Sequence, residues 1–306
     1  MAGRIVVVGS SNIDLVMKMP RLPRVGETVT DATFVQAFGG KGANQAVGAA
    51  RAGGDVAFVG CVGDDPYGAQ VRGNLEADGI DTRFVFTEPG VASGTALILV
   101  GGGGENYISV APGANDRLTR ARVDSAREAI DGASIVITQC EIPADTLEHV
   151  VALAARLGKP VLLNLAPARP LGGDALSKLS MLAVNETEAE FLSGLPVAGD
   201  ADVQEAADAL LAKGPRTVVL TLGARGAYVA GADVRALVPG FAVGAVDTTA
   251  AGDVHCGALA VALVEGRPML EAVRFANAAA ALSVTRLGAQ PSAPRRGDIE
   301  ALLSRG

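Results

Sequence analysis

One short segment combines small residues with an acidic side chain at the start of an apolar helix pattern. It reads Val246-Asp247-Thr248-Thr249-Ala250-Ala251-Gly252-Asp253. Small residues let the backbone amides of Ala250, Ala251 and Gly252 approach a ligand, and the helix dipole favours an anion at the same place. We predict an anion hole here, suited to a migrating phosphoryl group, with Asp253 as general base for an attacking hydroxyl. The alternative is that Asp253 only caps the helix.

A glycine-rich segment near the N-terminus, Phe38-Gly39-Gly40-Lys41-Gly42-Ala43-Asn44, leads into a second predicted helix. It is not a P-loop, because Lys41 is followed by Gly42 instead of Ser or Thr, and its glycine spacing does not fit a dinucleotide-binding fingerprint. The glycines would let a polyhydroxylated ligand approach the backbone, with Lys41 and Asn44 as hydrogen-bond donors. A tight strand-to-helix turn without a ligand is the alternative.

Polar side chains also follow two predicted strands, at the point where each strand ends. Asn12 and Asp14 come after the strand Ile5–Val8, and Glu141 comes after the strand Ile135–Thr138. Ligands of open α/β sheets bind beyond the carboxyl ends of the strands. We therefore expect these side chains to line a pocket for several hydroxyl groups, although each alone is typical of a solvated loop.

Two further segments are candidates for a nucleotide site. Asn185 and Glu188 lie about one turn apart at the start of a predicted helix, so both could face a metal–phosphate group; a capping role is the alternative. The segment Thr221-Leu222-Gly223-Ala224-Arg225-Gly226 ends another strand, and its glycines permit contact with a phosphate or a ribose. Of the two histidines, His149 fits a structural role, and His255 should point away from the face of Asp253 because a helix turns ~100° per residue.

Short apolar runs alternate with longer helical patterns, as expected for a parallel sheet with crossover helices. The predicted central strands are Ile5–Val8, Val56–Val59, Ile135–Thr138, Pro160–Leu163, Met181–Val184 and Val218–Leu222. The predicted helices are Asn44–Ala52, Tyr67–Asp78, Thr146–Leu157, Glu186–Ser193, Val203–Lys213, Asp253–Glu265 and Met269–Thr285. With no repeat and no low-complexity linker, we expect residues 1–306 to form a single α/β domain.

Two regions break this rhythm and predict a small β-sheet. Residues 15–35 alternate apolar positions with Pro20, Pro23 and Gly26, which suggests antiparallel strands. In residues 95–110, the runs Thr95–Val100 and Asn106–Val110 flank four glycines able to turn a hairpin. We expect these two insertions to form a lid that excludes water from the site; two surface hairpins without a moving part are the alternative.

Composition excludes several classes of protein. The net charge of −7 argues against nucleic-acid binding, which usually needs a basic face. Cys61, Cys140 and Cys256 form no CxxC pair and fit small buried residues in a reducing compartment. The N-terminal apolar run is too short for a signal peptide, and no stretch reaches the ~20 apolar residues of a membrane helix. We expect a cytoplasmic protein with no membrane or nucleic-acid partner.

Together these segments resemble the PfkB family of carbohydrate kinases. Gly39–Asn44 and Asp247–Asp253 match the two diagnostic patterns of the family. Further matches, spread over nearly the whole chain, are Pro112–Asn115, Asn164–Arg169, Asn185–Glu190, Thr221–Gly226 and Arg286–Ser292. One position departs from the pattern, because His255 stands where relatives usually carry an aromatic residue. The resemblance implies a three-layer α/β/α sandwich with a mostly parallel central sheet and a small β-sheet lid.

The resemblance also implies a role for each matching residue, with Asp253 as the catalytic base that activates the 5-hydroxyl of the sugar. Sugar-binding residues would be Asn12, Asp14, Gly40, Lys41, Asn44 and Glu141. ATP would be contacted by Asn185, Glu188, Thr221, Gly223, Ala224, Arg225, Gly226, Gly252 and Asn277. Magnesium would accompany ATP. A monovalent cation, usually potassium, would be held mostly by backbone carbonyls of Asp247, Thr249, Ser283, Arg286, Gly288 and Ser292. Relatives commonly form homodimers through their lids.

We therefore expect ATP-dependent phosphorylation of D-ribose to D-ribose 5-phosphate. Deoxyribose or fructose as the acceptor is the nearest alternative; a nucleoside is disfavoured by the low aromatic content of 4%, and a sugar phosphate by the few basic residues near Lys41. A catalytically silent sugar-binding protein on the same fold is a second alternative. A nicotinamide dehydrogenase is a third, weakened by the missing glycine fingerprint.

Overall fold

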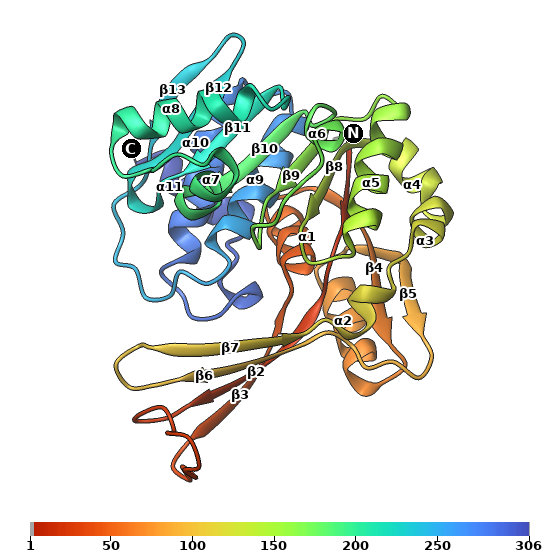
Figure 1. The fold of residues 1–306 in the computed structure, drawn as a ribbon, viewed down its shortest axis with the longest axis vertical. Coiled ribbons are helices and arrows are strands. Elements are labelled where there is room, and N and C mark those ends of the chain that lie inside the picture. The colour runs from red at the N-terminus through yellow and green to blue at the C-terminus, as the bar shows by residue number, and fades with distance from the viewer. Residues whose placement is uncertain (1–2, 306) are drawn as a thin grey trace.

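The computed structural model describes residues 3–305 and contains two β-sheets (Figure 1). The strands of the large sheet are β1 (Arg4–Val8), β4 (Asp55–Gly63), β5 (Asp81–Glu88), β8 (Ala133–Gln139), β9 (Val161–Asn164), β10 (Met181–Asn185), β11 (Thr217–Thr221), β12 (Gly226–Gly231) and β13 (Arg235–Pro239). Their order is β13-β12-β11-β10-β9-β8-β1-β4-β5. Neighbouring strands from β11 to β5 are parallel, whereas β12 and β13 form an antiparallel edge. The predicted mostly parallel sheet is therefore confirmed.

Alternation along the strands builds a core on each face of this sheet. In β1, Ile5 and Val7 pack into one core and Val6 and Val8 into the other, because successive side chains of a strand point to opposite faces. Helices of the first core are α1 (Lys41–Arg51), α2 (Pro66–Ala77), α9 (Ala251–Val264), α10 (Met269–Ser283) and α11 (Arg296–Leu303). Those of the second are α3 (Arg120–Ser125), α4 (Arg127–Asp131), α5 (Ala144–Arg156), α6 (Gly173–Leu176), α7 (Glu186–Ser193) and α8 (Asp200–Leu211). The result is a three-layer α/β/α sandwich.

The small sheet is the predicted lid. Its strands are β2 (Asn12–Lys18), β3 (Thr33–Gly39), β6 (Thr95–Val100) and β7 (Asn106–Ala111), in the order β3-β2-β6-β7. Both insertions contribute, and Figure 1 shows the sheet projecting from the α/β body as an arm. The first insertion differs from the prediction: β2 begins before residue 15, β3 ends beyond residue 35, and residues 19–32 contain no strand. The central pair, β2 with β6, is parallel, while the outer pairs are antiparallel.

Close packing of α1 against α9 positions the site. A Cβ atom at Gly257 of α9 would lie 2.5 Å from the backbone oxygen of Gln45, so only glycine lets the two helix backbones approach this closely. Both helices begin earlier than predicted, at Lys41 and Ala251, after the positive-φ residues Gly40 (φ 84°) and Ala250 (φ 60°). Asp253 consequently lies inside the first turn of α9 rather than at its cap. Among residues 3–305, no helix combines the length and apolar composition needed to cross a membrane.

Candidate active site

Glu141 joins the start of α1 to the end of β1. Its Oε2 accepts hydrogen bonds from Ser10 Oγ at 2.6 Å and from the backbone N–H of Lys41 at 3.0 Å. The glycines allow this approach, because a Cβ atom at Gly40 would lie 2.6 Å from Ser11 Cα. Segments far apart in the sequence therefore meet at the carboxyl edge of the sheet, as predicted. The sequence reading assigned no role to Ser10.

Asp14 enters the same region from the lid. Burial and the nearby charge of Glu141 raise the pKa of Asp14 to about 6. Asn12, also from β2, is buried, and its Oδ1 accepts a hydrogen bond from Asn115 Nδ2 at 2.8 Å. Asn115 in turn accepts from the N–H of Ser11 at 3.0 Å and so locks the strand end in place. Of the two predicted sugar ligands on β2, Asp14 is therefore the one whose side chain is more available to a ligand, because Asn12 Oδ1 is already bonded to Asn115.

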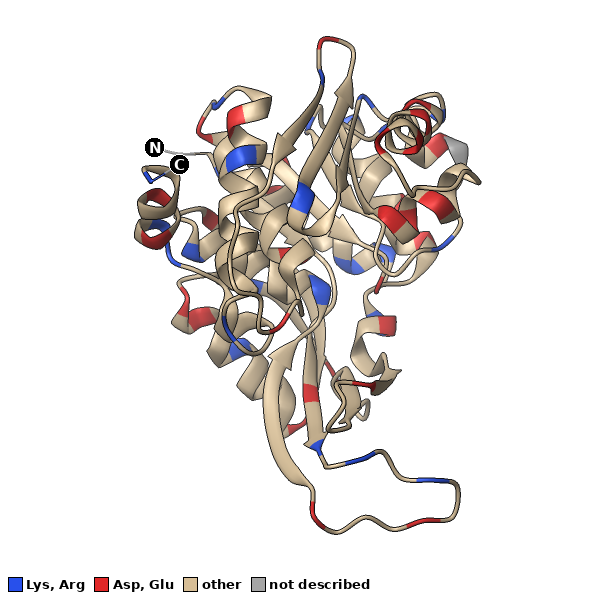
Figure 2. Cartoon of the chain, turned by 90° about the vertical axis from the view of Figure 1, so that its left-hand side faces the viewer, with Lys and Arg blue, Asp and Glu red and all other residues tan. Residues whose placement is uncertain are grey.

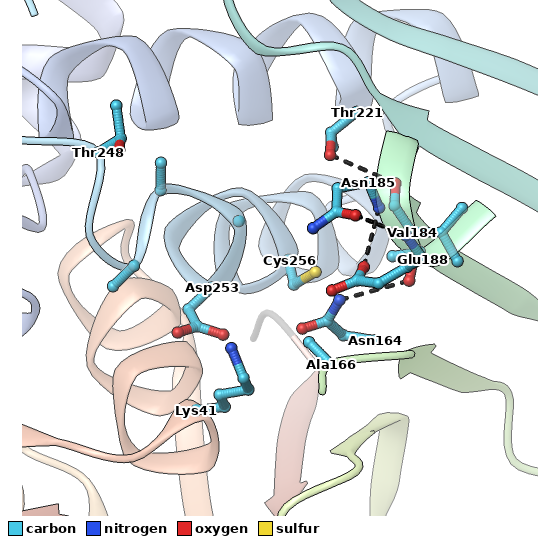
Figure 3. Close-up of a pocket in the computed structure, with 14 residues that line it drawn as sticks. Lys41, Asn164, Ala166, Val184, Asn185, Glu188, Thr221, Thr248, Asp253 and Cys256 are labelled. Atoms are coloured by element: carbon cyan, nitrogen blue, oxygen red, sulfur yellow. Dashed lines mark hydrogen bonds between the residues drawn. The ribbon is translucent and has the colours of Figure 1, made fainter. Parts of the chain in front are cut away.

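Asp253 does not cap its helix. Its carboxylate is only 5% exposed, and it accepts hydrogen bonds from Asn44 Nδ2 and Gln45 Nε2, both at 3.0 Å. Burial raises the pKa of Asp253, and this effect is opposed by the charge of Lys41 and by the two amide hydrogen bonds. Lys41 and Asp253 are turned toward each other in Figure 3. A buried carboxylate with these neighbours is suited to proton transfer.

Lys41 remains a cation in this setting. Burial opposes its charge, but the carboxylates of Asp253, Glu141 and Glu188 outweigh burial and raise the pKa of Lys41. Its ammonium group borders a cavity of about 210 Å³ that also contacts Asp253, Cys256, Asn185 and Glu188. A fixed positive charge beside the candidate base is the electrostatic complement of a transferring phosphoryl group.

The start of α9 separates this cavity from a larger one of about 650 Å³. Thr221, Thr248, Ala251 and Gly252 line both cavities. The N–H of Ala251 donates to the carbonyl of Thr248 at 3.2 Å, so one of the three predicted anion-hole amides is already engaged. The amides of Ala250 and Gly252 donate to no residue within the described part of the chain. These two amides are the candidate donors to an anion at the junction of the cavities.

The larger cavity has an apolar lining suited to a nucleotide. Gly223, Ala224 and Gly226 line it, as predicted, together with Phe241 and several small residues from positions 240–245 and 280–284. Arg225 is different: its guanidinium forms ion pairs with Glu186 and Asp200 at 2.9 and 3.0 Å, and it does not line the cavity. Its expected contact with ATP is not supported by this geometry, because the ion pairs hold the side chain at the acidic starts of α7 and α8.

Asn185 and Glu188 form a capping box and also line the smaller cavity. Asn185 Oδ1 accepts from the N–H of Glu188 at 2.8 Å, and Glu188 Oε2 accepts from the N–H of Asn185 at 2.9 Å. The capping role is therefore observed, while contact with a metal–phosphate group stays a prediction that the place of both residues on the cavity wall allows. Burial raises the pKa of Glu188. Thr221 Oγ1 donates to the carbonyl of Val184 at 3.3 Å.

Asn277 lines the larger cavity, but its side chain is held by the protein. Its Nδ2 donates to the carbonyls of Val238 and Pro239 at 3.0 and 3.2 Å, and its Oδ1 lies 3.2 Å from His255 Nε2. Burial lowers the pKa of His255 to about 4, so the imidazole is neutral and Nε2 is the donor. No chemistry was expected for His255 from the sequence, and in the structure it lines the larger cavity beside Asn277.

The predicted cation loop is closed by its own aspartate. Asp247 Oδ1 accepts from the N–H and hydroxyl of Thr249 at 2.9 and 2.6 Å, and Asp247 Oδ2 accepts from the N–H of Gly288 at 2.8 Å. Ser283 and Arg286 are joined by a turn bond of 3.1 Å, and Ser292 Oγ donates to Ala289 at 2.7 Å. Within residues 3–305, no donor reaches the carbonyl oxygens of Asp247, Thr249 or Gly288. Such free carbonyls fit a monovalent cation.

Two buried carboxylates, those of Glu188 and Asp253, line the smaller cavity, and Glu188 is the one that would remain for a magnesium ion beside a base at Asp253. This fits the usual mode, in which magnesium is held by one or two carboxylates and by substrate phosphates. No group of three or more His, Cys, Asp or Glu side chains in the described chain could hold a metal by itself.

The comparisons with known proteins agree with this geometry. Residues 2–296 match the pfkB family of carbohydrate kinases. A ribokinase of Bacillus subtilis is 42% identical over 98% of this chain and 99% of its own length. A deoxyribokinase of Salmonella typhi is 37% identical over 95% of each chain. The structure of Arabidopsis thaliana ribokinase complexed with ribose and ATP superimposes with a TM-score of 0.94 at 34% identity, covering 99% of each chain. The chain therefore belongs to the pfkB family of carbohydrate kinases.

Proposed function

We propose that this carbohydrate kinase transfers the γ-phosphoryl group of ATP to the 5-hydroxyl of D-ribose, giving D-ribose 5-phosphate and ADP. The observation that carries the proposal is the place of Asp253: a buried carboxylate at the N-terminus of α9, where the two cavities share a wall. The ribokinase names of the Bacillus and Arabidopsis relatives support ribose as the acceptor.

The residues divide the reaction among them. Asp253 takes the proton of the attacking hydroxyl as it bonds to the γ-phosphorus, and the ADP oxygen leaves in line on the other side. The amides of Ala250 and Gly252 and the ammonium of Lys41 stabilise the charge on the phosphoryl oxygens. The lid excludes water, which would otherwise compete as acceptor.

Sugar recognition rests on groups that converge at the carboxyl edge of the sheet. Asp14 and Glu141 accept hydrogen bonds from sugar hydroxyls, and Asn44 offers its Oδ1, which has no partner among described residues. Gly40 allows the start of α1 to approach the backbone of Ser11 and Asn12, which brings Lys41 and Asn44 to this edge. Asn12 contributes through its packing with Asn115.

The nucleotide occupies the larger cavity, with its phosphates toward Asn185, Glu188, Thr221 and Gly252. When bound, magnesium neutralises charge on the phosphates, and Glu188 is the carboxylate placed to hold it. Potassium would sit among the free carbonyls of the Asp247 loop and stiffen the segment that leads into α9. Three free, buried cysteines support a cytoplasmic location.

A homodimer through the lid is part of the proposal. In register, Val35, Val16, Ile98 and Ile108 lie side by side on one face of the lid, which is also the face of Asp14. Ile108 is 60% exposed, and Val35 and Val110 are also exposed. A partner lid would bury this apolar face, which begins where the sugar site ends.

Deoxyribose is the alternative acceptor that a specific observation favours, because the Salmonella relative is a deoxyribokinase. A panel of ribose, deoxyribose, fructose and a nucleoside, assayed by coupled ADP release with and without potassium, tests the choice. We expect the highest kcat/KM for ribose and a several-fold gain with potassium. A higher kcat/KM for deoxyribose would make deoxyribose the acceptor in place of ribose. The absence of turnover with every sugar would support the alternative of a catalytically silent sugar-binding protein.

A further inference from the structure

Two consecutive amide side chains of α1 reach the candidate base. Asn44 Nδ2 donates to Asp253 Oδ2, and Gln45 Nε2 donates to Asp253 Oδ1, each at 3.0 Å. Both can do so because α1 and α9 pack backbone to backbone at Gly257. The carboxylate is therefore held at both oxygens before any substrate arrives.

The two amides differ in what they have left to offer. Asn44 Oδ1 is buried and has no partner among residues 3–305, so one acceptor of this amide is left over. Gln45 is 0% exposed, and its amide is fully engaged: Nε2 also donates to Asn164 Oδ1 at 3.1 Å, and Oε1 accepts from Gln139 Nε2 at 2.7 Å. Gln45 cannot touch a substrate, so its influence on the reaction must pass through Asp253.

The orientation of the Gln45 amide is fixed by its surroundings. Asn164 Nδ2 donates to the carbonyl of Ala183 at 3.3 Å, which leaves Asn164 Oδ1 as the acceptor toward Gln45. Only the NH₂ end of Gln45 can then satisfy both Asn164 and the Asp253 carboxylate. This buried network links α1 to α9 and to β8, β9 and β10. Its hydrogen bonds together hold the NH₂ group of Gln45 toward Asp253.

We propose that Gln45 is a positioning residue for phosphoryl transfer, whose side-chain amide holds Asp253 Oδ1 so that the carboxylate faces the acceptor hydroxyl. The inference rests on the proposed function, in which Asp253 is the base. The proposed function gives Gln45 no part in binding the sugar or the nucleotide.

The hydrogen bond also has an electrostatic consequence. Burial raises the pKa of Asp253, and Lys41, Asn44 and Gln45 lower it again, while Glu141 raises it further. The charge of Glu188 also faces the site from α7, and the Cys256 thiol lies on the same face of α9 as Asp253, one turn further along. Loss of the Gln45 donor would raise the pKa of Asp253, because less of the charge of the carboxylate would then be stabilised.

The test is the pH dependence of kcat in Gln45→Met, which keeps the length and apolar body of the side chain and removes its amide. We expect the acid limb of the profile to move to higher pH by about one unit, so that kcat on that limb falls by up to about tenfold. The KM for ribose should change less than about threefold, and the lost kcat should return as the pH rises above the shifted limb. A loss caused only by packing would not be recovered by raising the pH.

Gln139→Met is the matched control. Gln139 is equally buried and belongs to the same network, but it does not contact Asp253. We expect Gln139→Met to lower thermal stability and to leave the acid limb in place. If Gln45→Met does not fold, Gln45→Glu replaces it, because a carboxyl at this position must compete with Asp253 for a proton and should shift the limb in the same direction.

An unchanged acid limb in a folded Gln45 variant, or equal shifts in the Gln45 and Gln139 variants, would overturn the inference. Its failure is separable from that of the proposed function. If Asp253→Ala abolishes turnover while Gln45→Met keeps the wild-type profile, only the role of Gln45 is wrong. If Asp253→Ala retains turnover, the base itself is misassigned.

Discussion

At the scale of single residues, the site contains carboxylates whose burial is unfavourable for folding but useful for binding and catalysis. Asp14, Glu188 and Asp253 all have raised pKa values for which burial is the first cause. Removing such a carboxylate should stabilise the protein and damage its activity. Asp14 gives the clearest case, because its pKa is shifted to a measurable value.

We predict that Asp14→Asn raises the free energy of unfolding at pH 7. The folded pKa of Asp14 is about 6 against an ordinary 3.8, so the folded state holds this proton more tightly and loses stability as the pH rises from 4 to 6. The gain should reach at most about 3 kcal/mol at pH 7 and fall below about 1 kcal/mol near pH 4, where the folded wild-type carboxyl is protonated and the unfolded one is only partly ionised. Urea denaturation at both pH values measures it; an equal difference at the two would contradict the assigned cause.

The same titration should appear in sugar binding. Because ionised Asp14 is the better acceptor for sugar hydroxyls, we expect ribose affinity to fall as the pH drops below about 6 in the wild-type protein. Calorimetry of ribose binding between pH 5 and 8 measures this. Asp14→Asn, as the control, should bind ribose weakly and without that pH dependence.

The residue types of the site could be predicted from the sequence, but their partners could not. Asp253, Lys41, Asn44 and Glu141 stand out because charged or amide side chains adjoin glycine turns and strand ends. Gln45 gave no such signal. Its bond to Asp253 joins residues 208 positions apart, and it depends on how closely two helices pack.

At the scale of elements, the start of α9 is the segment that lies between the two cavities. Gly252 lines both cavities, and a Cβ atom there would meet nothing within 4 Å, so a methyl group would fit the fold and occupy the space between the two substrates. A substitution of Gly252 by alanine can therefore change catalysis without disturbing the packing of the fold.

We predict that Gly252→Ala keeps the melting temperature within a few degrees of wild type and lowers kcat/KM for ATP at least about tenfold. Gly297→Ala is the matched control, because Gly297 is also helical and open but lies on α11, away from both cavities. Scanning calorimetry and steady-state kinetics on both variants decide the point. Normal kinetics in Gly252→Ala would show that the junction is not where the phosphoryl group passes.

Among the elements, the centre of the large sheet was predicted and the strands at its two edges were missed. Six central strands follow from apolar runs, whereas β12, which begins and ends with glycine, and β13 form the antiparallel edge. The strand β5 was missed because its charged residues hide its apolar alternation. Arg225 was predicted to contact the nucleotide because its loop was predicted to do so. The direction of its side chain is set by ion pairs with Glu186 and Asp200, which the sequence does not reveal.

At the scale of the whole molecule, the lid differs in character from the body. Charged side chains of both signs are scattered over the α/β body, whereas the lid strands carry very few (Figure 2). The apolar lid face around Ile108 is therefore the candidate dimer interface. The insertions were predictable from broken rhythm, but the parallel pairing of β2 with β6 was not, because it depends on how two distant insertions meet.

We predict that Ile108→Glu makes the protein monomeric, since a charge would have to be buried in an apolar interface. Leu237→Glu is the control, because Leu237 is also exposed but lies on β13, at the far edge of the large sheet. Sedimentation velocity measures both. A wild-type protein that is monomeric at micromolar concentration would remove the dimer from the proposal.

The central claim is that Asp253 accepts the proton of the sugar hydroxyl at the junction of the two cavities. The most direct test measures kcat and ribose affinity together in Asp253→Ala. The account predicts that kcat falls by about 10²–10⁴ or more while calorimetry still detects ribose binding. A kcat within a few-fold of wild type would contradict it.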